Sequence, residues 1–134
     1  MVVQWRGNEV FALVKGAGVQ SIVRGVEAVK DETVRLVNTG PKTGRVYRRN
    51  GVVHQASAPG QAPAGDTGDL ASKIGTAVDA DKMTGTVEFY SAHAKMLEYG
   101  TQRMSPRPFA RVALADKSEE IAKDIAESIG RVLK

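Results

Sequence analysis

The chain has 134 residues and a mass of 14.3 kDa, and 42% of its residues are hydrophobic. This length and composition predict one domain, spanning residues 1–134, that can bury an ordinary core. The chain has no cysteine and two histidines, which excludes disulfides, thiolate metal sites and histidine-rich metal sites. The first residues lack the pattern of a secretory signal, and no apolar run reaches the roughly 20 residues that cross a bilayer. We therefore expect a soluble chain, intracellular at synthesis, with no membrane partner.

The formal net charge is +4, from 19 basic and 15 acidic residues. Such a mixed surface with a modest basic excess is a weak indication of nucleic-acid binding. Aromatic residues make up 5% of the chain, which argues against a stacking platform for single-stranded nucleic acid.

The N-terminal part of the chain has the apolar periodicity of an amphipathic helix, from Asn8 to about Thr39. Asn8 is a good N-cap, and Gly40-Pro41 is a good stop. Glycines lower helix propensity by up to about 1 kcal/mol each, so a bend or a break is expected near Gly16 to Gly18.

The middle of the chain is rich in strand and turn signals. Asn50-Gly51 joins two β-prone runs, Thr43–Arg49 and Val52–Ala56, and this dipeptide favours a type I′ hairpin. The uncharged segment from Ser57 to Gly65 contains two prolines and two glycines and is expected to be an extended loop.

A short helix is predicted next, over Asp66–Ile74, followed by a second pair of strands at Gly75–Asp81 and Thr86–Tyr90. One or two helical turns are then expected over Ala92–Tyr99, ending at Gly100.

A polar loop with two prolines covers Thr101–Pro108, and helical periodicity returns over Phe109–Leu114 and Ser118–Leu133. In that last helix the acidic residues come early and Arg131 and Lys134 late, which complements a helix dipole. The predicted fold class is α+β: a long N-terminal helix, a small antiparallel β-sheet with an Asn-Gly hairpin, short helices and a C-terminal amphipathic helix.

Catalytic and phosphate-binding motifs are absent from the sequence. It contains no Gly-x-Ser-x-Gly elbow, and Gly40-Pro-Lys-Thr-Gly44 lacks the spacing of a Walker loop. His54 and His93 have no metal-ligand partner three or four residues away. We therefore expect no enzymatic activity, no catalytic residue, no metal and no cofactor.

Four basic residues, Lys42, Arg45, Arg48 and Arg49, lie within eight positions that contain no acid. They are candidates for contacts to DNA or to an acidic protein face. The alternative is a solvated hairpin edge, where positive charge discourages edge-to-edge pairing.

Two blocks of the sequence carry a family resemblance. The first runs from Ala92 to Leu114 and contains Glu-Tyr-Gly-Thr, then Met-x-x-Arg-Pro-Phe, then Arg-Val-Ala-Leu. The second is the Ser-x-Pro-Gly-x-x-Pro loop beginning at Ser57, followed by Thr-Gly-x-Leu ending at Leu70. Together they resemble the tail-component family of lambdoid siphophages over about residues 8 to 130. The chain departs from that pattern at Val112, where the family has proline, and just after Tyr90, where a Tyr-Ala pair is usual.

Members of that family act as tail-completion or head-to-tail joining proteins of tailed bacteriophages and prophages. The resemblance implies a virion protein of the tail or neck, assembled in the host cytoplasm as a ring around the DNA channel. Its partners are then other copies of the chain, tail-tube, tail-terminator or head-connector proteins, and DNA passing through the channel. The assembly-interface candidates are the motif residues Ser57, Pro59, Gly60, Pro63, Thr67, Gly68, Leu70, Glu98, Tyr99, Gly100, Thr101, Met104, Arg107, Pro108, Phe109 and Arg111.

Three alternatives stay open at this point, and one of them is a hydrolase that acts through His54 or His93. The motif residues can instead be internal, with Arg107 paired to Glu98 and Phe109 in the core. The chain can also be a small basic nucleic-acid-binding or regulatory protein that uses the hairpin over residues 43–56 as a β-ribbon.

Overall fold

The computed structural model describes residues 2–4, 6–39, 42–60 and 69–133. The fold is α+β, as the sequence predicts. Within these residues it contains two long helices, two short helices and two separate antiparallel sheets of two strands each.

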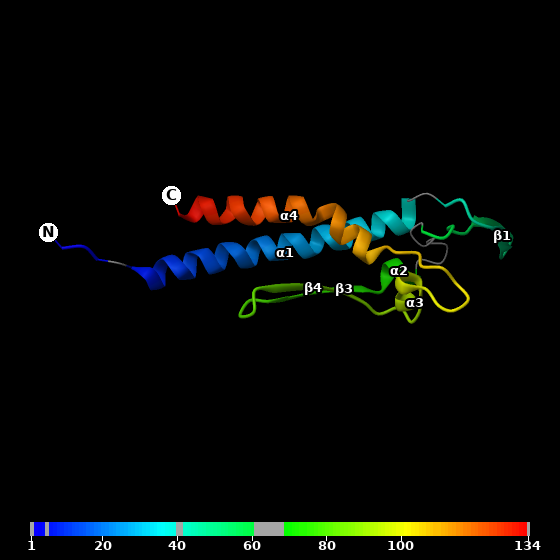
Figure 1. Ribbon diagram of the computed structural model, residues 1–134, viewed down its shortest axis with the longest axis horizontal. Coiled ribbons are helices and arrows are strands. Elements are labelled where there is room, and N and C mark those ends of the chain that lie inside the picture. The colour runs from blue at the N-terminus through cyan, green and yellow to red at the C-terminus, as the bar shows by residue number, and fades with distance from the viewer. Residues whose placement is uncertain (1, 5, 40–41, 61–68, 134) are drawn as a thin grey trace.

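The two long helices, α1 (Gly7–Thr39) and α4 (Ala110–Val132), lie side by side along the long axis of the molecule (Figure 1). They run antiparallel, so that both ends of the chain lie at the same end of the molecule. Arg24 of α1 joins them, because its guanidinium donates to the Asp124 carboxylate at 2.9 Å and to the Ser128 hydroxyl at 2.8 Å.

The N-terminal helix is continuous through its glycines. The bend or break expected near Gly16 to Gly18 is wrong in this respect, since α1 keeps helical structure over all of its 33 residues. Gly18 is buried, and a Cβ built there would lie 2.7 Å from the Met83 side chain. The atom it would meet is the Cε at the flexible end of that side chain, and packing along α1 as a whole outweighs the low helix propensity of its glycines.

A hairpin of β3 (Ile74–Asp79) and β4 (Thr84–Phe89) lies along the other side of α1 (Figure 1). Gly85 brings β4 close to α1: a Cβ at this position would meet Val26, and would lie 2.8 Å from the Ile22 side chain. We call α1, α4 and the β3–β4 hairpin together the shaft.

A second hairpin, β1 (Val46–Arg49) with β2 (Val52–Gln55), projects at the end of the molecule opposite the termini (Figure 1). The strands pair antiparallel, with Val46 opposite Gln55 and Arg49 opposite Val52. Asn50 and Gly51 lie between them with φ of 50° and 78°. We call this hairpin the ribbon.

The core lies where the shaft meets two short helices, α2 (Asp69–Ser72) and α3 (Ala94–Tyr99). Its centre is Phe109, which is 1% exposed and packs edge-to-face on Phe89 with ring centroids 5.1 Å apart. Val37 of α1, Leu70 of α2 and Ala94 of α3 close the cluster around it.

The C-terminal helix begins earlier than its charges predict. It is one continuous helix from Ala110, so the acidic residues that follow Ser118 lie in its middle, and its first turn holds no acidic side chain. The prediction that acidic side chains complement the helix dipole is therefore wrong at the N-terminus of α4. At the C-terminus, basic Arg131 does lie in the last turn.

Candidate assembly surfaces

The two sequence blocks that carry the family resemblance pack against each other. The Arg107 guanidinium donates to the Ser57 carbonyl at 3.2 Å, and the Gly60 N–H donates to the Pro106 carbonyl at 3.0 Å. The Arg107 N–H also donates to the Leu97 carbonyl at 2.7 Å, which fixes the loop on α3. The motif thus builds one connection between segments about fifty residues apart.

Glu98 of α3 caps α4. Its carboxylate accepts hydrogen bonds from the backbone N–H groups of Phe109, Ala110 and Arg111 at 2.9, 3.0 and 3.0 Å. The Arg111 guanidinium also donates to it, at 2.8 Å. The predicted pairing of Arg107 with Glu98 is therefore wrong: Glu98 takes Arg111, one helical turn later, because the helix N-terminus turns that side chain back over α3.

The electrostatics of Glu98 follow from these contacts. Burial alone raises the pKa of its carboxyl, but the backbone N–H groups of Phe109 and Arg111 and the guanidinium of Arg111 outweigh burial. The pKa of Glu98 therefore lies below its usual range, and the carboxylate stays charged at the helix N-terminus, where negative charge is favoured.

Other motif residues shape the same connection. Gly100 ends α3 with φ of 77°, and a Cβ there would lie 2.8 Å from the Met104 carbonyl oxygen. Thr101 and Met104 form an isolated antiparallel bridge. Tyr99 is exposed, and the Arg111 guanidinium lies 5.1 Å above its ring.

The interface candidates therefore divide into an internal and an external group. Four side chains are buried in the molecule: Ser57, Leu70, Glu98 and Phe109. Those exposed to solvent remain candidates for contacts with another molecule: Pro59, Gly60, Tyr99, Thr101 and Arg111. Gly100, Met104, Arg107 and Pro108 are half-buried between the two groups. Pro63, Thr67 and Gly68 lie outside the described residues. An interface role for the exposed group stays a prediction.

The basic residues of the ribbon region whose side chains are described differ in exposure. Lys42 is half-buried, its ammonium donates to the Leu36 carbonyl at 3.1 Å, and burial lowers its pKa. Arg45 and Arg48 are exposed. The side chain of Arg49 lies outside what the structure describes.

The ribbon presents an apolar face that the sequence analysis did not identify. Val46 and Val53 are 59% and 58% exposed. The strand register places them on one face, together with Arg48 and Gln55. On the opposite face Tyr47 stacks on His54, with ring centroids 5.6 Å apart. Side chains alternate between the two faces of a strand, so the sequence predicts which residues share a face. It does not predict which face packs against another part of the protein.

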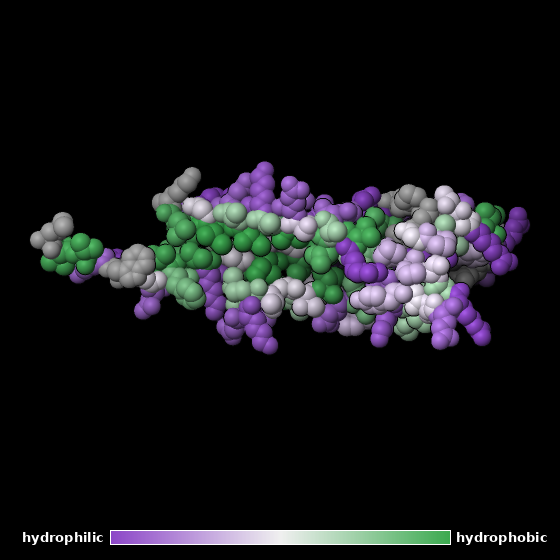
Figure 2. Space-filling view, viewed as in Figure 1, coloured by the Kyte–Doolittle hydropathy of each residue, from purple (hydrophilic) through white to green (hydrophobic). Residues whose placement is uncertain are grey.

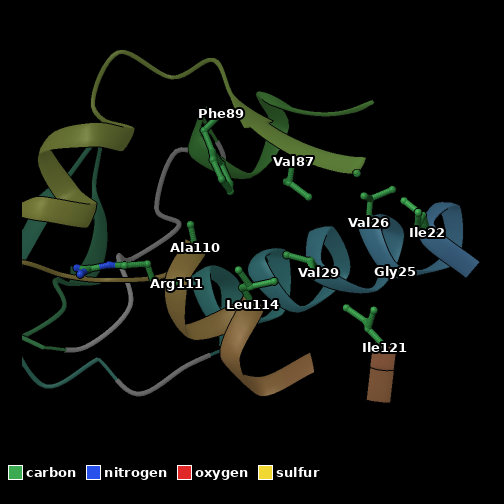
Figure 3. Close-up of a pocket in the computed structure, with 11 residues that line it drawn as sticks. Ile22, Gly25, Val26, Val29, Val87, Phe89, Ala110, Arg111, Leu114 and Ile121 are labelled. Atoms are coloured by element: carbon green, nitrogen blue, oxygen red, sulfur yellow. The ribbon is translucent and has the colours of Figure 1, made fainter. Parts of the chain in front are cut away.

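The shaft holds an apolar groove of about 380 Å³ between α1, β4 and α4 (Figure 3). Ile22, Val26 and Val29 line it from α1, Val87 and Phe89 from β4. The α4 wall is made by Ala110, Arg111, Leu114 and Ile121. Its side chains converge from three elements that are far apart in sequence, which is why motif reasoning missed it.

The groove belongs to a wider apolar band. Figure 2 shows hydrophobic side chains gathered along the middle of one face, over the shaft, with hydrophilic side chains above and below. Leu114 on this part of α4 is 55% exposed.

Among the described residues no three His, Asp or Glu side chains gather in a way that could hold a metal ion. His54 lies in the stack described above, and His93 precedes the first turn of α3. None of the helices in the described part of the chain combines the length and the apolar character needed to cross a membrane.

Comparison with known proteins adds nothing to these surfaces. No protein-family model, curated protein or solved structure matches the chain.

Proposed function

We propose that this chain is a non-enzymatic structural subunit of a tailed-bacteriophage virion. In this proposal it assembles with copies of itself into a ring at the neck, around the DNA channel, where it completes the tail or joins the tail to the head. Tail-tube, tail-terminator or head-connector proteins are its further partners, and the sequence resemblance indicates this setting.

The observation that carries the proposal is apolar surface exposed at two separate places on the described part of the chain. Val46 and Val53 of the ribbon are 59% and 58% exposed, and Leu114 beside the groove is 55% exposed. A subunit in a ring contacts two neighbours and therefore needs two different contact surfaces.

The positions of the exposed apolar features also favour a ring. The ribbon lies at one end of the molecule and the groove lies on the shaft, so the two features are different in shape and place. Contacts between unlike faces are heterologous, and they close into a ring when the rotation between neighbours permits it.

Immunogold electron microscopy tests the proposal. An antibody to this chain is applied to particles made by the host that carries the gene, and label at the head–tail junction is the expected result. Complete particles without label at that position, together with a chain that stays monomeric in native mass spectrometry at every concentration, would overturn the proposal.

A second candidate function rests on the charge of the ribbon region. Residues 42–65 contain four basic residues and no acidic one, and Arg45 and Arg48 are exposed. A small DNA-binding or regulatory protein could use such a β-ribbon for phosphate contacts. The dependence of DNA affinity on salt separates this candidate from the first.

A further inference from the structure

The geometry points to the pair of faces that meet between neighbouring copies. We infer that the Val46–Val53 face of the ribbon of one copy docks into the apolar groove on the shaft of the next copy. This inference rests on the proposed function, because it specifies how the ring is built.

The ribbon needs a covering partner. A hairpin of two strands is marginally stable in water unless a third strand or another element packs on it. Val46 and Val53 expose more than half of their surfaces, and they lie diagonally across the two strands on one face, opposite Gln55 and Arg48 respectively. Such a face fits an apolar groove that has a polar margin.

The groove cannot be filled by the ribbon of the same copy. Val26 lines the groove, and α1 continues for 13 residues from there to Thr39, a length of about 20 Å. The ribbon then extends beyond that end of α1, away from the groove (Figure 1). Because the ribbon face and the groove lie apart within one copy, neither buries the other. Both apolar surfaces become buried when the ribbon of a second copy docks into the groove.

Charge favours the same pairing. The ribbon region is basic throughout, with no acid between residues 42 and 65. The three shaft elements together carry more acidic than basic residues: α1 has four of each, α4 has five acids and four bases, and the β3–β4 hairpin has three acids and one base. A second hollow beside the groove is lined by three acids, Glu120, Asp124 and Glu127, and by two bases, Arg24 and Lys123. These acids already pair with Lys117, Arg24 and Lys123 of the same chain, so the charge argument rests on the net charge of the shaft elements. Arg45 and Arg48 of an incoming ribbon would approach elements of opposite net charge.

Cross-linking through introduced cysteines tests the inference. The chain has no cysteine of its own, so a maleimide reacts only with the introduced thiols. The variant Val53→Cys plus Leu114→Cys places one thiol on the ribbon and one in the groove, both at exposed positions. A short bifunctional maleimide should link this variant into a ladder of dimers, trimers and larger species. The single variants should give no species beyond a dimer.

The matched control is Val53→Cys plus Leu133→Cys. Leu133 is 58% exposed, as Val53 is, but it lies about 28 Å farther along α4 than Leu114. The ladder should be at least tenfold weaker in this control. Equal ladders in the two variants would overturn the inference, because the ribbon would then have no preference for the groove.

A mixing experiment tests the heterologous character of the contact. Val46→Asp plus Val53→Asp disables the ribbon, and Leu114→Asp disables the groove. Each variant alone should be monomeric, while the mixture should give a one-to-one heterodimer that grows no further. If both variants still form rings of wild-type size, the inference is wrong and other faces build the ring, with the proposed function intact. A wild-type chain that never self-associates and never labels particles removes the proposed function itself.

Discussion

Glu98 links three parts of the molecule through one carboxylate. It lies on α3, it accepts three backbone hydrogen bonds from the start of α4, and it pairs with Arg111, whose guanidinium lies over Tyr99. A buried charge of this kind stabilises the fold only while all of its partners are present. The Glu-Tyr-Gly-Thr segment therefore has a structural reason to contain an acid.

Replacing Glu98 with glutamine should destabilise the chain by at least about 2 kcal/mol, because hydrogen bonds to a charged acceptor are lost at a helix N-terminus. Urea unfolding of the wild type and of Glu98→Gln measures this difference. Glu119→Gln, on the exposed surface of α4, is the matched control and should change the free energy of unfolding by less than about 0.5 kcal/mol.

The difference in free energy of unfolding between the wild type and Glu98→Gln should also depend on pH, in a direction set by the pKa of Glu98. Its folded pKa lies below the unfolded value, so the stabilisation is fully present above the unfolded pKa of about 4.3. It is lost as the pH falls through the folded pKa. The wild type and Glu98→Gln should therefore converge in stability as the pH falls from about 7 to about 2. Curves that stay parallel would contradict this account.

Residue roles in the motif were predicted from the sequence in part. Phe109 lies in the core, as the internal alternative holds, since a large aromatic side chain after a stiff Pro-rich loop has few other places to pack. The same alternative pairs Glu98 with Arg107, whereas the structure pairs it with Arg111. That choice depends on where α4 begins, and helix starts are hard to place when the capping group comes from another element.

At the scale of elements, apolar periodicity predicts both long helices correctly. The interruptions that local residues predict in them are not present in the structure. Gly18 predicts a weak point in α1, and the charges after Ser118 predict a late start for α4, yet both helices are continuous. Packing between α1, α4 and β4 supplies more stability than local propensity removes. Sequence periodicity reports which face of a helix is apolar, but not which neighbour covers it.

Substitutions at two glycines distinguish the effect of helix propensity on stability from the effect of packing between elements. Gly85→Ala should destabilise the chain by about 1 to 3 kcal/mol, since the added Cβ meets Val26 and Ile22 of α1. Gly16→Ala in α1 meets nothing within 4 Å and should stabilise the helix by about 1 kcal/mol. Thermal unfolding followed by circular dichroism should move in opposite directions for the two variants. A stabilising Gly85→Ala would mean that β4 does not lie this close to α1.

The ribbon as an element allows a test between assembly and DNA binding. If Arg45, Arg48 and Arg49 each neutralise one phosphate, affinity for duplex DNA should fall about 40-fold between about 50 and 200 mM salt. We expect weak binding at every salt concentration instead, because the ribbon face centres on Val46 and Val53. Fluorescence anisotropy with a labelled duplex distinguishes the two. Tight binding with the steep salt dependence would favour the DNA-binding candidate.

At the scale of the whole molecule, the fold class was predicted and the shape was not. The sequence contains enough apolar residues for an ordinary core, and the expectation was that they would be buried. The structure buries few large ones completely and leaves others exposed along the shaft and the ribbon. A sequence cannot tell an apolar stripe that its own chain covers from one that a second copy covers, because both have the same periodicity. The groove is lined from three elements that are far apart in the sequence, so no local motif marks it.

The stability of the whole chain should depend on its concentration. If copies bind one another only when folded, association stabilises the folded state by mass action, and a tenfold rise in concentration adds up to about 1.4 kcal/mol for each contact. The midpoint of thermal unfolding should then rise by several degrees for each tenfold increase in protein. The variant Val46→Asp plus Val53→Asp should show a flat dependence and, at low concentration, the same midpoint as the wild type, because both side chains are exposed in the isolated chain. Differential scanning calorimetry measures both. A wild-type midpoint that is independent of concentration up to the millimolar range would mean that the exposed apolar surface is not a contact between copies.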